Sequence, residues 1–469
     1  MKVLLVNTPP HDLDDIIKSK RSRATALRGK QIFPTGLLSI GAYLESKGVS
    51  PEYSDMWNMS WDEIRSTIQK INPDIIFSSC LTDNRLSSFK LASIAKQINP
   101  AIINVVGNAH ATAMCEQILT HYSDVDFVVL GEGEETCLDL IHVLQNNGDI
   151  SKVLGIAYRD SGNIHITDRR PLMNLDDIPY PTNTLRFDPD NPHDATIGTS
   201  RGCPYGCDYC SLSGFWEHKW RGKNPKLVEA EIQFLVSNGI THVTFVDDHF
   251  TFKKDRALEI CKILKKYNIS WSMQCRVDRI DRELLIACRD SNCRLIAFGV
   301  ETLSPTILKS IHKQFTIEQI KDIFKTAHEV RIPVQANIII GCPNETETTI
   351  KETIRNLNEI RPDAIGKFIL MLYPDTPLYR RLKLYNQIND DIWLSPSPTP
   401  FYTIENDLST LRKYSLQVQM QWFRQIGISR TIKELSSIMK EHGWQFGIDY
   451  ILSGLSRIKI KKFRLSKNY

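Results

Sequence analysis

Three cysteines lie within eight residues of this sequence, in a C-x3-C-x2-C spacing: Cys203, Cys207 and Cys210. Deprotonated sulfur atoms this close together suit a metal centre, because each thiolate can ligate the same ion or cluster. A closed zinc site or an ordinary iron–sulfur cluster takes four protein ligands, so three cysteines predict a centre with one open coordination position. Gly202 and Gly206 permit the tight backbone that would wrap such a centre.

Two other interpretations of the three cysteines stay open. They are buried apolar residues, or they form a zinc site that is completed by His218 or Cys275. The tight spacing and the flanking glycines and proline favour the metal centre. The first interpretation suits the scattered cysteines elsewhere in the chain, for example Cys80, Cys115, Cys137, Cys261 and Cys288.

The cysteine loop, with Tyr209 directly before the third cysteine, resembles the signature of radical-SAM enzymes. The resemblance implies a 4Fe–4S cluster on the three cysteines, whose fourth iron is chelated by the amino and carboxylate groups of S-adenosylmethionine. It also implies that an electron, from a donor such as flavodoxin or ferredoxin, cleaves S-adenosylmethionine to a 5′-deoxyadenosyl radical. That radical would abstract hydrogen from a substrate.

Residues 1–150 alternate strand-like and helix-like stretches. Strands are predicted at 3–6, 74–78, 102–106 and 126–130, and helices at 37–47 and 86–97. The alternation predicts a doubly wound, flavodoxin-like α/β domain. In such a domain the ligand lies beyond the carboxyl ends of the strands, which here are 78–84, 107–110 and 131–136.

These strand ends, with residues 34–38, resemble the cobalamin-binding domain that precedes the barrel in one large radical-SAM subgroup. The implied cofactor contacts are Ser78, Thr82, Gly107, Asn108, His110, Gly131, Glu132, Gly133 and Glu134. The D-x-H-x-x-G motif is absent, so no histidine is offered from it as a lower axial ligand. Asn108 also stands where a second glycine is usual. The other interpretation is a sheet domain that has lost its cofactor.

Residues 151–190 are predicted to connect two domains, through a hairpin around Gly162 and a rigid linker at 175–181. Six strand-then-helix units follow in residues 191–390. Their strands are predicted at 195–200, 242–246, 270–276, 295–300, 334–340 and 364–372, with helices such as 227–237 and 350–359 between them. Six parallel units predict a partial (β/α)6 barrel, whose reactive groups gather at the carboxyl ends of its strands.

The ends of the later barrel strands offer contacts for S-adenosylmethionine. The resemblance places Asp247 and Asp248 near its methionine amino group, and Glu301 near its ribose and methionine. Arg276 ends the third strand, where it would pair with the carboxylate. Gly341 ends the fifth, where its backbone would approach adenine. Each charged residue has a structural alternative, which is a salt bridge at the barrel rim.

Composition limits the rest of the chain. A chain of 469 residues with 42% hydrophobic content can form several domains, and 391–469 reads as a helical region with amphipathic stretches at 414–426 and 432–442. The net charge of +4 comes from 457–467, which holds six Lys or Arg and no acid. This tail is predicted to be solvated, the alternatives being contact with an anionic membrane or RNA, and no nucleic-acid-binding face is expected.

The cellular setting is predicted from two absences and the cysteine content. No apolar run reaches the roughly 18 residues of a transmembrane span, and the amino end is not a signal peptide. Eleven cysteines in such a chain favour a reducing compartment, so a cytoplasmic protein is expected.

Together, the resemblances imply a cobalamin-binding radical-SAM enzyme that acts on a small-molecule or natural-product substrate. The leading activity is methylation of an unactivated carbon, in which one S-adenosylmethionine methylates cob(I)alamin and a second supplies the radical. An oxidative ring formation or rearrangement, as in the anaerobic magnesium-protoporphyrin monomethyl ester cyclases, is the alternative reaction. A non-catalytic iron–sulfur or corrinoid carrier is the alternative of another class. A methylthiotransferase is disfavoured, because no further group of three cysteines occurs in the amino-terminal domain.

Overall fold

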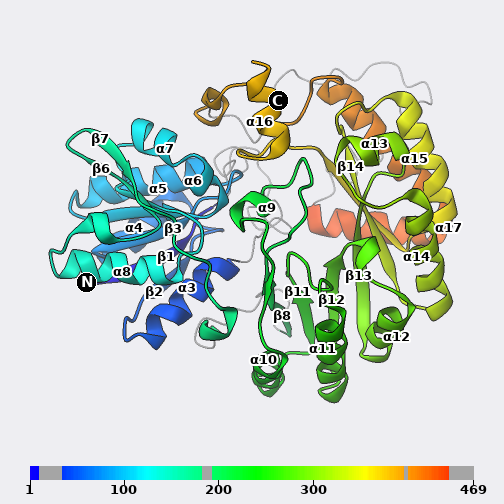
Figure 1. Cartoon of the computed structure of the whole chain (residues 1–469), viewed down its shortest axis with the longest axis horizontal. Coiled ribbons are helices and arrows are strands. Elements are labelled where there is room, and N and C mark those ends of the chain that lie inside the picture. The colour runs from blue at the N-terminus through cyan, green and yellow to red at the C-terminus, as the bar shows by residue number, and fades with distance from the viewer. Residues whose placement is uncertain (10–33, 182–192, 396–399, 443–469) are drawn as a thin grey trace.

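The computed structural model describes residues 1–9, 34–181, 193–395 and 400–442. A sheet domain from the amino-terminal part and a partial barrel from the rest lie side by side, with the short helix α9 (Leu212–Phe215) between them (Figure 1). The basic segment 457–467 and the connection at 182–190 lie outside the described residues. The predicted order of a doubly wound domain, a partial barrel and a helical carboxyl-terminal region is confirmed.

The first sheet has seven strands in the order β2-β1-β3-β4-β5-β6-β7. Strands β1 to β5 are parallel, β6 pairs antiparallel with β5, and β7 pairs antiparallel with β6. The interior strand β1, between β2 and β3, is buried along its whole length, as a parallel strand covered on both faces should be. The strands are β1 (Val3–Asn7), β2 (Glu52–Asp55), β3 (Ile75–Ser79), β4 (Ile103–Gly107), β5 (Phe127–Val129), β6 (Ile156–Asp160) and β7 (Asn163–Ile166).

Helices cover both faces of this sheet. Successive side chains of β1 enter different apolar clusters, because a strand alternates its faces. Val3 and Leu5 pack with α3 (Thr35–Ser46) and α8 (Glu134–Gln145), whereas Leu4 and Val6 pack with α4 (Trp61–Ile71) and α5 (Arg85–Ile98). The described part of the domain also contains α6 (Ala109–Ala113) and α7 (Cys115–His121).

The second sheet has six parallel strands in the order β15-β14-β13-β12-β11-β8. They are β8 (Asp194–Ile197), β11 (His242–Phe245), β12 (Ser270–Cys275), β13 (Cys293–Glu301), β14 (Val334–Ile340) and β15 (Ala364–Ile369). The helices that follow them are α10 (Pro225–Ser237), α11 (Lys254–Lys266), α12 (Arg282–Asp290), α13 (Pro305–Ser310), α14 (Ile317–Val330) and α15 (Glu347–Ile360). Phe245, Trp271 and Phe298 belong to the apolar cluster beneath these helices, while polar residues such as Thr244 and Ser272 hydrogen-bond to each other across the strands.

The predicted first barrel strand, 195–200, is divided in the structure. β8 ends at Ile197, and after Gly198 the chain leaves the barrel sheet. β9 (Ser200–Arg201) then pairs antiparallel with β10 (Arg221–Gly222) in a separate two-stranded ribbon. The hairpin of β6 and β7 also differs from expectation, because it extends the first sheet although the sequence assigned it to the connecting segment.

The two domains share an apolar cluster. It combines Phe89, Met114 and Leu130 of the first domain with Leu372 and Trp393, among others, of the second. Trp393 belongs to the 3-10 turn Asp390–Trp393, which follows α16 (Pro377–Leu384). The fully buried Arg85 of α5 donates hydrogen bonds to the backbone oxygens of Trp393 (3.1 Å) and Ser395 (3.3 Å). The barrel is therefore packed on the sheet domain and not merely tethered to it.

The carboxyl-terminal helical region is a long helix, α17 (Leu408–His442), with a break at Gly427. The predicted stretches 414–426 and 432–442 lie on either side of that break. Trp422 of the first half packs into the barrel cluster and donates to the backbone oxygen of Pro362 (3.2 Å). Within the described ranges, no helix is both long and apolar enough to cross a membrane.

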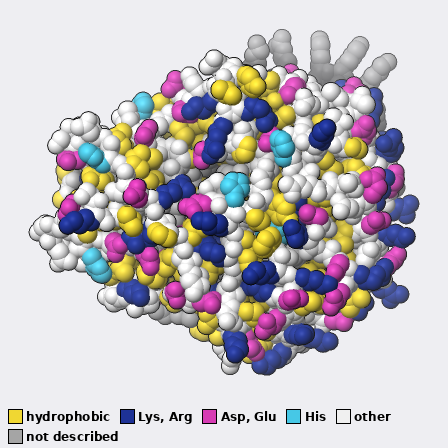
Figure 2. All heavy atoms as spheres, in the orientation of Figure 1, with side chains coloured by type: hydrophobic (Ala, Val, Ile, Leu, Met, Phe, Trp, Pro, Cys, Tyr) yellow, Lys and Arg dark blue, Asp and Glu magenta, His cyan; other side chains and the backbone are white. Residues whose placement is uncertain are grey.

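Charged side chains of both signs are interspersed on the face of the molecule shown in Figure 2. Lysines and arginines alternate there with aspartates and glutamates, most densely over the helices of the barrel. A surface that binds nucleic acid concentrates positive charge on one face or along one stripe. The face in Figure 2 has no such concentration among the described residues.

Candidate functional site

The cluster loop, residues 202–210, begins at a glycine that no other residue can replace without movement of the backbone. Gly202 has a φ of +90°, and a Cβ added there would lie 1.9 Å from the carbonyl oxygen of Lys219. The backbone N–H of Gly202 donates to Asp248 (2.7 Å). The start of the loop is thus fixed between the chain at Lys219 and the strand end that carries Asp248.

Asp247 supports the chain just before the loop. Its carboxylate accepts hydrogen bonds from the backbone N–H of Thr199 (2.7 Å), from the hydroxyl of Thr199 (2.7 Å) and from the hydroxyl of Ser200 (2.6 Å). Burial raises the pKa of Asp247, and it raises the pKa of Asp248 to about 6. Both residues were predicted to contact S-adenosylmethionine; the structure gives them loop-supporting contacts, and the cofactor contact stays a prediction.

The three thiols form a donor set that suits a cluster. Cys207 is buried, Cys203 and Cys210 are half-buried, and the Arg276 guanidinium lies 3.9 Å from the sulfur of Cys207. Burial raises the pKa of Cys210 to about 11, so an additional positive charge is needed to hold its thiolate. Iron supplies that charge, since a thiol that coordinates a metal is deprotonated.

The geometry argues against a single ion at the cysteines. In the part of the chain that the structure describes, no three His, Cys, Asp or Glu side chains are arranged to hold one metal ion. Among the described residues, His218 and Cys275 are not brought into such a group with the three cysteines. In a four-iron cluster each thiolate binds a different iron, so the sulfur atoms need not converge on one point.

Arg276 already has partners on the protein. Its Nε and Nη2 donate to Asp278 (2.9 and 3.0 Å), and its guanidinium stacks on the Tyr205 ring, 3.6 Å from the ring centroid. Its third nitrogen, Nη1, faces Cys207. Pairing with the carboxylate of S-adenosylmethionine, as predicted from the sequence, would be added to these contacts and stays a prediction.

Tyr209 and Glu301 come together with a lysine that the sequence analysis missed. Lys313 is buried and lies 3.0 Å from the Glu301 carboxylate, with its ammonium 5.8 Å from the Tyr209 ring centroid. Burial and the nearby charge of Glu301 raise the pKa of Tyr209. No motif in the sequence marks Lys313, since it follows a short helix outside the strand ends.

Asp208 anchors the middle of the loop to the barrel and to α16. Its buried carboxylate accepts from His312 Nδ1 (2.7 Å) and Arg381 Nη1 (2.7 Å), and its backbone oxygen accepts from the N–H of Leu378 (2.9 Å). These partners are 104 to 173 positions away in the sequence. Distance in the sequence explains why they were not predicted.

Gly341 ends β14 with a φ of +90°, as a close approach requires, but the nearest neighbour there is a side chain of the protein. A Cβ at this position would lie 2.9 Å from Leu411 of α17. The N–H of Gly341 donates to the buried carboxylate of Glu345, whose pKa burial raises to about 7. The predicted contact with adenine stays a prediction.

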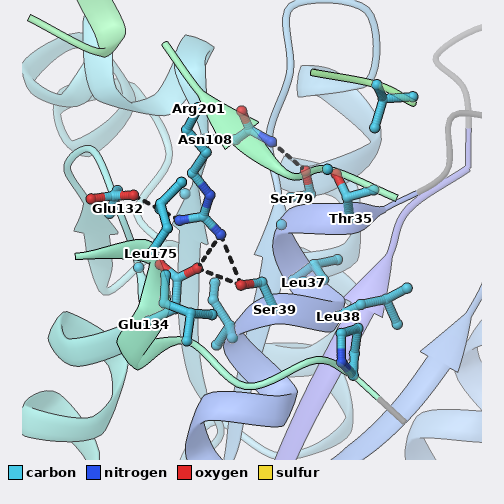
Figure 3. Close-up of a pocket in the computed structure, with 18 of the residues that line it drawn as sticks. Thr35, Leu37, Leu38, Ser39, Ser79, Asn108, Glu132, Glu134, Leu175 and Arg201 are labelled. Atoms are coloured by element: carbon cyan, nitrogen blue, oxygen red, sulfur yellow. Dashed lines mark hydrogen bonds and ion pairs between the residues drawn. The ribbon is translucent and has the colours of Figure 1, made fainter. Parts of the chain in front are cut away.

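A cavity of about 300 Å³ lies between the carboxyl edge of the first sheet and the start of the barrel (Figure 3). Its first wall comes from α3 and from the ends of β3, β4 and β5. Its second wall comes from β8, the residues around Arg201, and Asp248. Predicted cofactor contacts on these walls are Ser78, Gly107, Asn108, Gly131, Glu132, Gly133 and Glu134.

Two predicted cobalamin contacts, Thr82 and His110, do not line this cavity. They hydrogen-bond to each other (3.2 Å), and the His110 ring packs edge-on against Trp393, 5.5 Å between centroids. Burial lowers the pKa of His110 to about 3, which keeps the ring neutral. His110 lies at the contact between the domains, where Trp393 packs against it, and the contact of both residues with cobalamin stays a prediction.

The first wall fits a large ligand that approaches the backbone. A Cβ at Gly133 would lie 2.7 Å from the terminal methyl of Ile40, so a larger residue there would require that side chain to move. Asn108 has φ +91° and ψ −176°, a conformation that essentially only glycine adopts, and its amide donates to Ser79 (3.0 Å). No histidine is among the described residues that line the cavity. The wall fits cobalamin held without a histidine from the protein, and that mode of binding stays a prediction.

Arg201 crosses from the cluster loop to the first wall of the cavity (Figure 3). Its guanidinium lies 2.7 Å from Glu132, 2.7 Å from Glu134 and 2.8 Å from the hydroxyl of Ser39. Burial alone would raise the pKa of Glu134, but the charge and hydrogen bonds of Arg201 hold it below its ordinary value. The two glutamates predicted as cofactor contacts therefore bind an arginine that the sequence analysis did not single out.

These features define a two-domain α/β metalloprotein with a ligand cavity on one side of a thiolate loop. Models of two known families match the corresponding parts of the chain: the B12 binding domain matches residues 24–141, and the radical SAM superfamily matches residues 197–357. An uncharacterized methyltransferase of Pyrococcus horikoshii is 30% identical over 412 residues, which cover 86% of this chain and 88% of that protein.

Two further comparisons agree with these matches. The anaerobic magnesium-protoporphyrin IX monomethyl ester cyclase of Rubrivivax gelatinosus is 29% identical over 362 residues, which cover 74% of this chain and 64% of the cyclase. The cobalamin-dependent S-adenosylmethionine radical enzyme OxsB, solved with aqua-cobalamin and S-adenosylmethionine bound, superposes with a TM-score of 0.71. That superposition has 19% identity and covers 97% of this chain and 72% of OxsB, so it bears on the fold alone.

The chain belongs to the radical SAM enzymes that carry a B12 binding domain. Its cofactors are accordingly a 4Fe–4S cluster, S-adenosylmethionine and cobalamin. The alternative of a sheet domain without cofactor and that of a non-catalytic carrier are both set aside by this membership.

Proposed function

We propose that this enzyme methylates an unactivated carbon of a small molecule or natural product. The observation that carries the proposal is the position of the cavity, which is bounded by strand ends of both domains and reaches Arg201, two residues before Cys203. Transfer between two cofactors requires them to face a shared, enclosed space. The similarity to a named methyltransferase along most of the chain supports the choice of reaction.

In this proposal Cys203, Cys207 and Cys210 hold the cluster, and the walls of the cavity hold cobalamin. The cluster with S-adenosylmethionine supplies a carbon-centred radical, and cobalamin supplies the methyl carrier. Arg276 offsets negative charge at the thiolates through its contact with Cys207. The ion pair of Lys313 with Glu301 holds that carboxylate beside Tyr209, at the edge of the cluster loop. An electron donor such as a flavodoxin or ferredoxin completes the system.

Product stoichiometry tests the reaction. Each methyl transfer consumes two molecules of S-adenosylmethionine, so S-adenosylhomocysteine and 5′-deoxyadenosine should rise in equal amounts. Both products should require cobalamin, a reductant and the true substrate. Conversion of substrate with 5′-deoxyadenosine and without S-adenosylhomocysteine would contradict methyl transfer.

Oxidative ring formation is the second candidate, and the similarity to the Rubrivivax gelatinosus cyclase favours it. The same assay separates the two reactions. A cyclisation forms a ring without adding a carbon, so the product formula would keep the carbon count of the substrate. Methylation adds the mass of one methylene group.

A further inference from the structure

The segment that carries the cluster loop is closed at its base by two arginines. Arg201 in β9 and Arg221 in β10 are direct partners in the antiparallel ribbon, and residues 202–220 extend from that ribbon. Like charges directly opposite each other on a ribbon repel. The ribbon therefore depends on carboxylates from elsewhere in the molecule.

Those carboxylates come from the cavity wall of the sheet domain. The Glu132 carboxylate accepts hydrogen bonds from both arginines, from Arg201 at 2.7 Å and from Arg221 at 2.8 and 3.0 Å. The Glu134 carboxylate accepts hydrogen bonds from Arg201 and from the Ser39 hydroxyl. The two glutamate side chains are only 5% and 3% exposed, so the ion pairs are shielded from water.

Movement of the ribbon is transmitted to the cysteines by a short and rigid path. Gly202 joins Arg201 to Cys203, and it is held by Asp248 on one side and by close contact with Lys219 on the other. Trp216, also on the cavity wall, lies near both guanidinium groups, 5.9 Å from Arg201 and 5.6 Å from Arg221. The wall of the cobalamin cavity and the base of the cluster loop are thus one connected network.

We propose that Arg201 and Arg221 are positioning residues, through which the wall of the cobalamin cavity fixes the cluster loop. When bound cobalamin restricts the motion of Glu132 and Glu134, it also restricts the motion of residues 202–220. In this arrangement the two glutamates connect the cavity wall to the loop through their ion pairs with the two arginines. The inference does not depend on whether methyl transfer or ring formation follows.

Hydrogen exchange of residues 202–220, followed by mass spectrometry, tests this inference without an activity measurement. The protein is reconstituted anaerobically with iron and sulfide, and exchange is compared with and without hydroxocobalamin. In the wild type, cobalamin should slow exchange in this segment by about five-fold or more, the lower end of typical coupling between sites. Absence of slowing in a wild type that has bound cobalamin would overturn the proposal.

Glu134→Gln tests the connection itself, because it removes one charge and keeps a similar shape. This variant, held at a hydroxocobalamin concentration that saturates its binding as followed by absorption, should lose most of the slowing in 202–220. Unchanged slowing would contradict the proposal. Loss of cobalamin binding would also contradict it, since Glu134 would then be a cofactor contact. If Glu134→Gln fails to fold, Arg201→Lys is tested by the same two criteria.

Glu135→Gln is the matched control. Glu135 is the next residue of helix α8 and also forms an ion pair, with Arg170 at 3.2 Å, but among the described residues it has no contact with the ribbon or the cavity. This control should keep wild-type iron content, cobalamin affinity and cobalamin-dependent slowing of exchange. If this control also loses the slowing of exchange, then any change at the start of α8 disturbs residues 202–220. That outcome would contradict a specific role of Glu134.

Discussion

Gly202 and Asn108 of the site hold backbone conformations that side chains rarely adopt. Gly202 is a glycine, the residue type that permits such a conformation. Asn108 carries a side chain, so its conformation is strained. The difference is informative, because strain kept at a ligand site costs about 1–3 kcal/mol and needs surrounding contacts to hold it. Each position therefore predicts a different response to substitution.

Replacement of Gly202 by Ala should destabilise the protein by about 3 kcal/mol or more, because positive φ and a clash with backbone add together. The contact is with the carbonyl oxygen of Lys219, which cannot rotate away as a side chain could. Chemical unfolding measures the loss, and iron content should fall with it. Gly198→Ala is the control: a Cβ there meets nothing within 4 Å, so stability should change by only about 0.5 kcal/mol.

At Asn108, replacement by Gly and replacement by Ala should change the stability by different amounts. Asn108→Gly loses the hydrogen bond to Ser79, worth about 1 kcal/mol, but it also relieves the strain, so stability should stay within about 1 kcal/mol of the wild type. Asn108→Ala loses the bond and keeps the strain, and should cost about 1–2 kcal/mol. Urea unfolding of both variants decides. A glycine variant less stable than the alanine variant would show that the strain is not real.

At the scale of elements, the loop after β14 carries a pH dependence. Glu345 is 2% exposed, and burial raises its pKa from 4.5 to about 7. The folded state therefore holds this proton more tightly than the unfolded state does, and Glu345 makes stability fall as pH rises from about 4.5 to about 7. Above about pH 8 its contribution is constant.

Glu345→Gln cannot ionise and should remove this dependence. Relative to the wild type, the variant should gain up to about 3 kcal/mol of stability between pH 5 and pH 8. Urea unfolding of both proteins at several pH values gives the difference. Glu347→Gln, an exposed neighbour paired with Lys351 at 3.1 Å, should show almost no such trend. A difference between Glu345→Gln and wild type that does not vary with pH would refute the assignment.

The elements that the sequence predicted well are those with a local pattern. Buried and mainly apolar strands such as Val3–Asn7 are identified by their sequence, and the cysteine spacing identifies the loop without any knowledge of the fold. The edge strand Glu52–Asp55 was missed because its residues are polar and largely accessible. The division of the first barrel strand depends on Asp247, nearly 50 residues away, and no local pattern contains that information.

The candidate site shows the same limit. Glycines and acids at strand ends were predicted to gather around a ligand, and seven of those residues line the cavity. The partners of Glu132 and Glu134 were not predicted, because Arg201 and Arg221 are 67 to 89 positions away. Thr82 and His110 do not line this cavity; His110 packs against Trp393 from a distant part of the chain, and the cobalamin contact of both residues stays a prediction.

For the whole molecule, the shared apolar cluster predicts a single cooperative unfolding transition. Trp393 is buried between the domains, and Trp393→Ala should cost about 3–5 kcal/mol. Because its loss weakens the contact between the domains, calorimetry should resolve two transitions in the variant and one in the wild type. Trp61→Ala, on α4 away from the interface, should lower the melting temperature and keep one transition. Two transitions in the wild type would contradict a shared core.

The shared core also has a consequence for the protein while it is being synthesised. The face formed by Phe89, Met114 and Leu130 is complete early, but its covering residues, such as Leu370 and Trp393, lie about 240 residues or more further along the chain. At about 5–20 residues per second, translation leaves that face uncovered for roughly 10–50 s. The nascent sheet domain thus leaves the ribosome with an apolar surface of its own, and it should depend on chaperones until the end of the barrel has emerged.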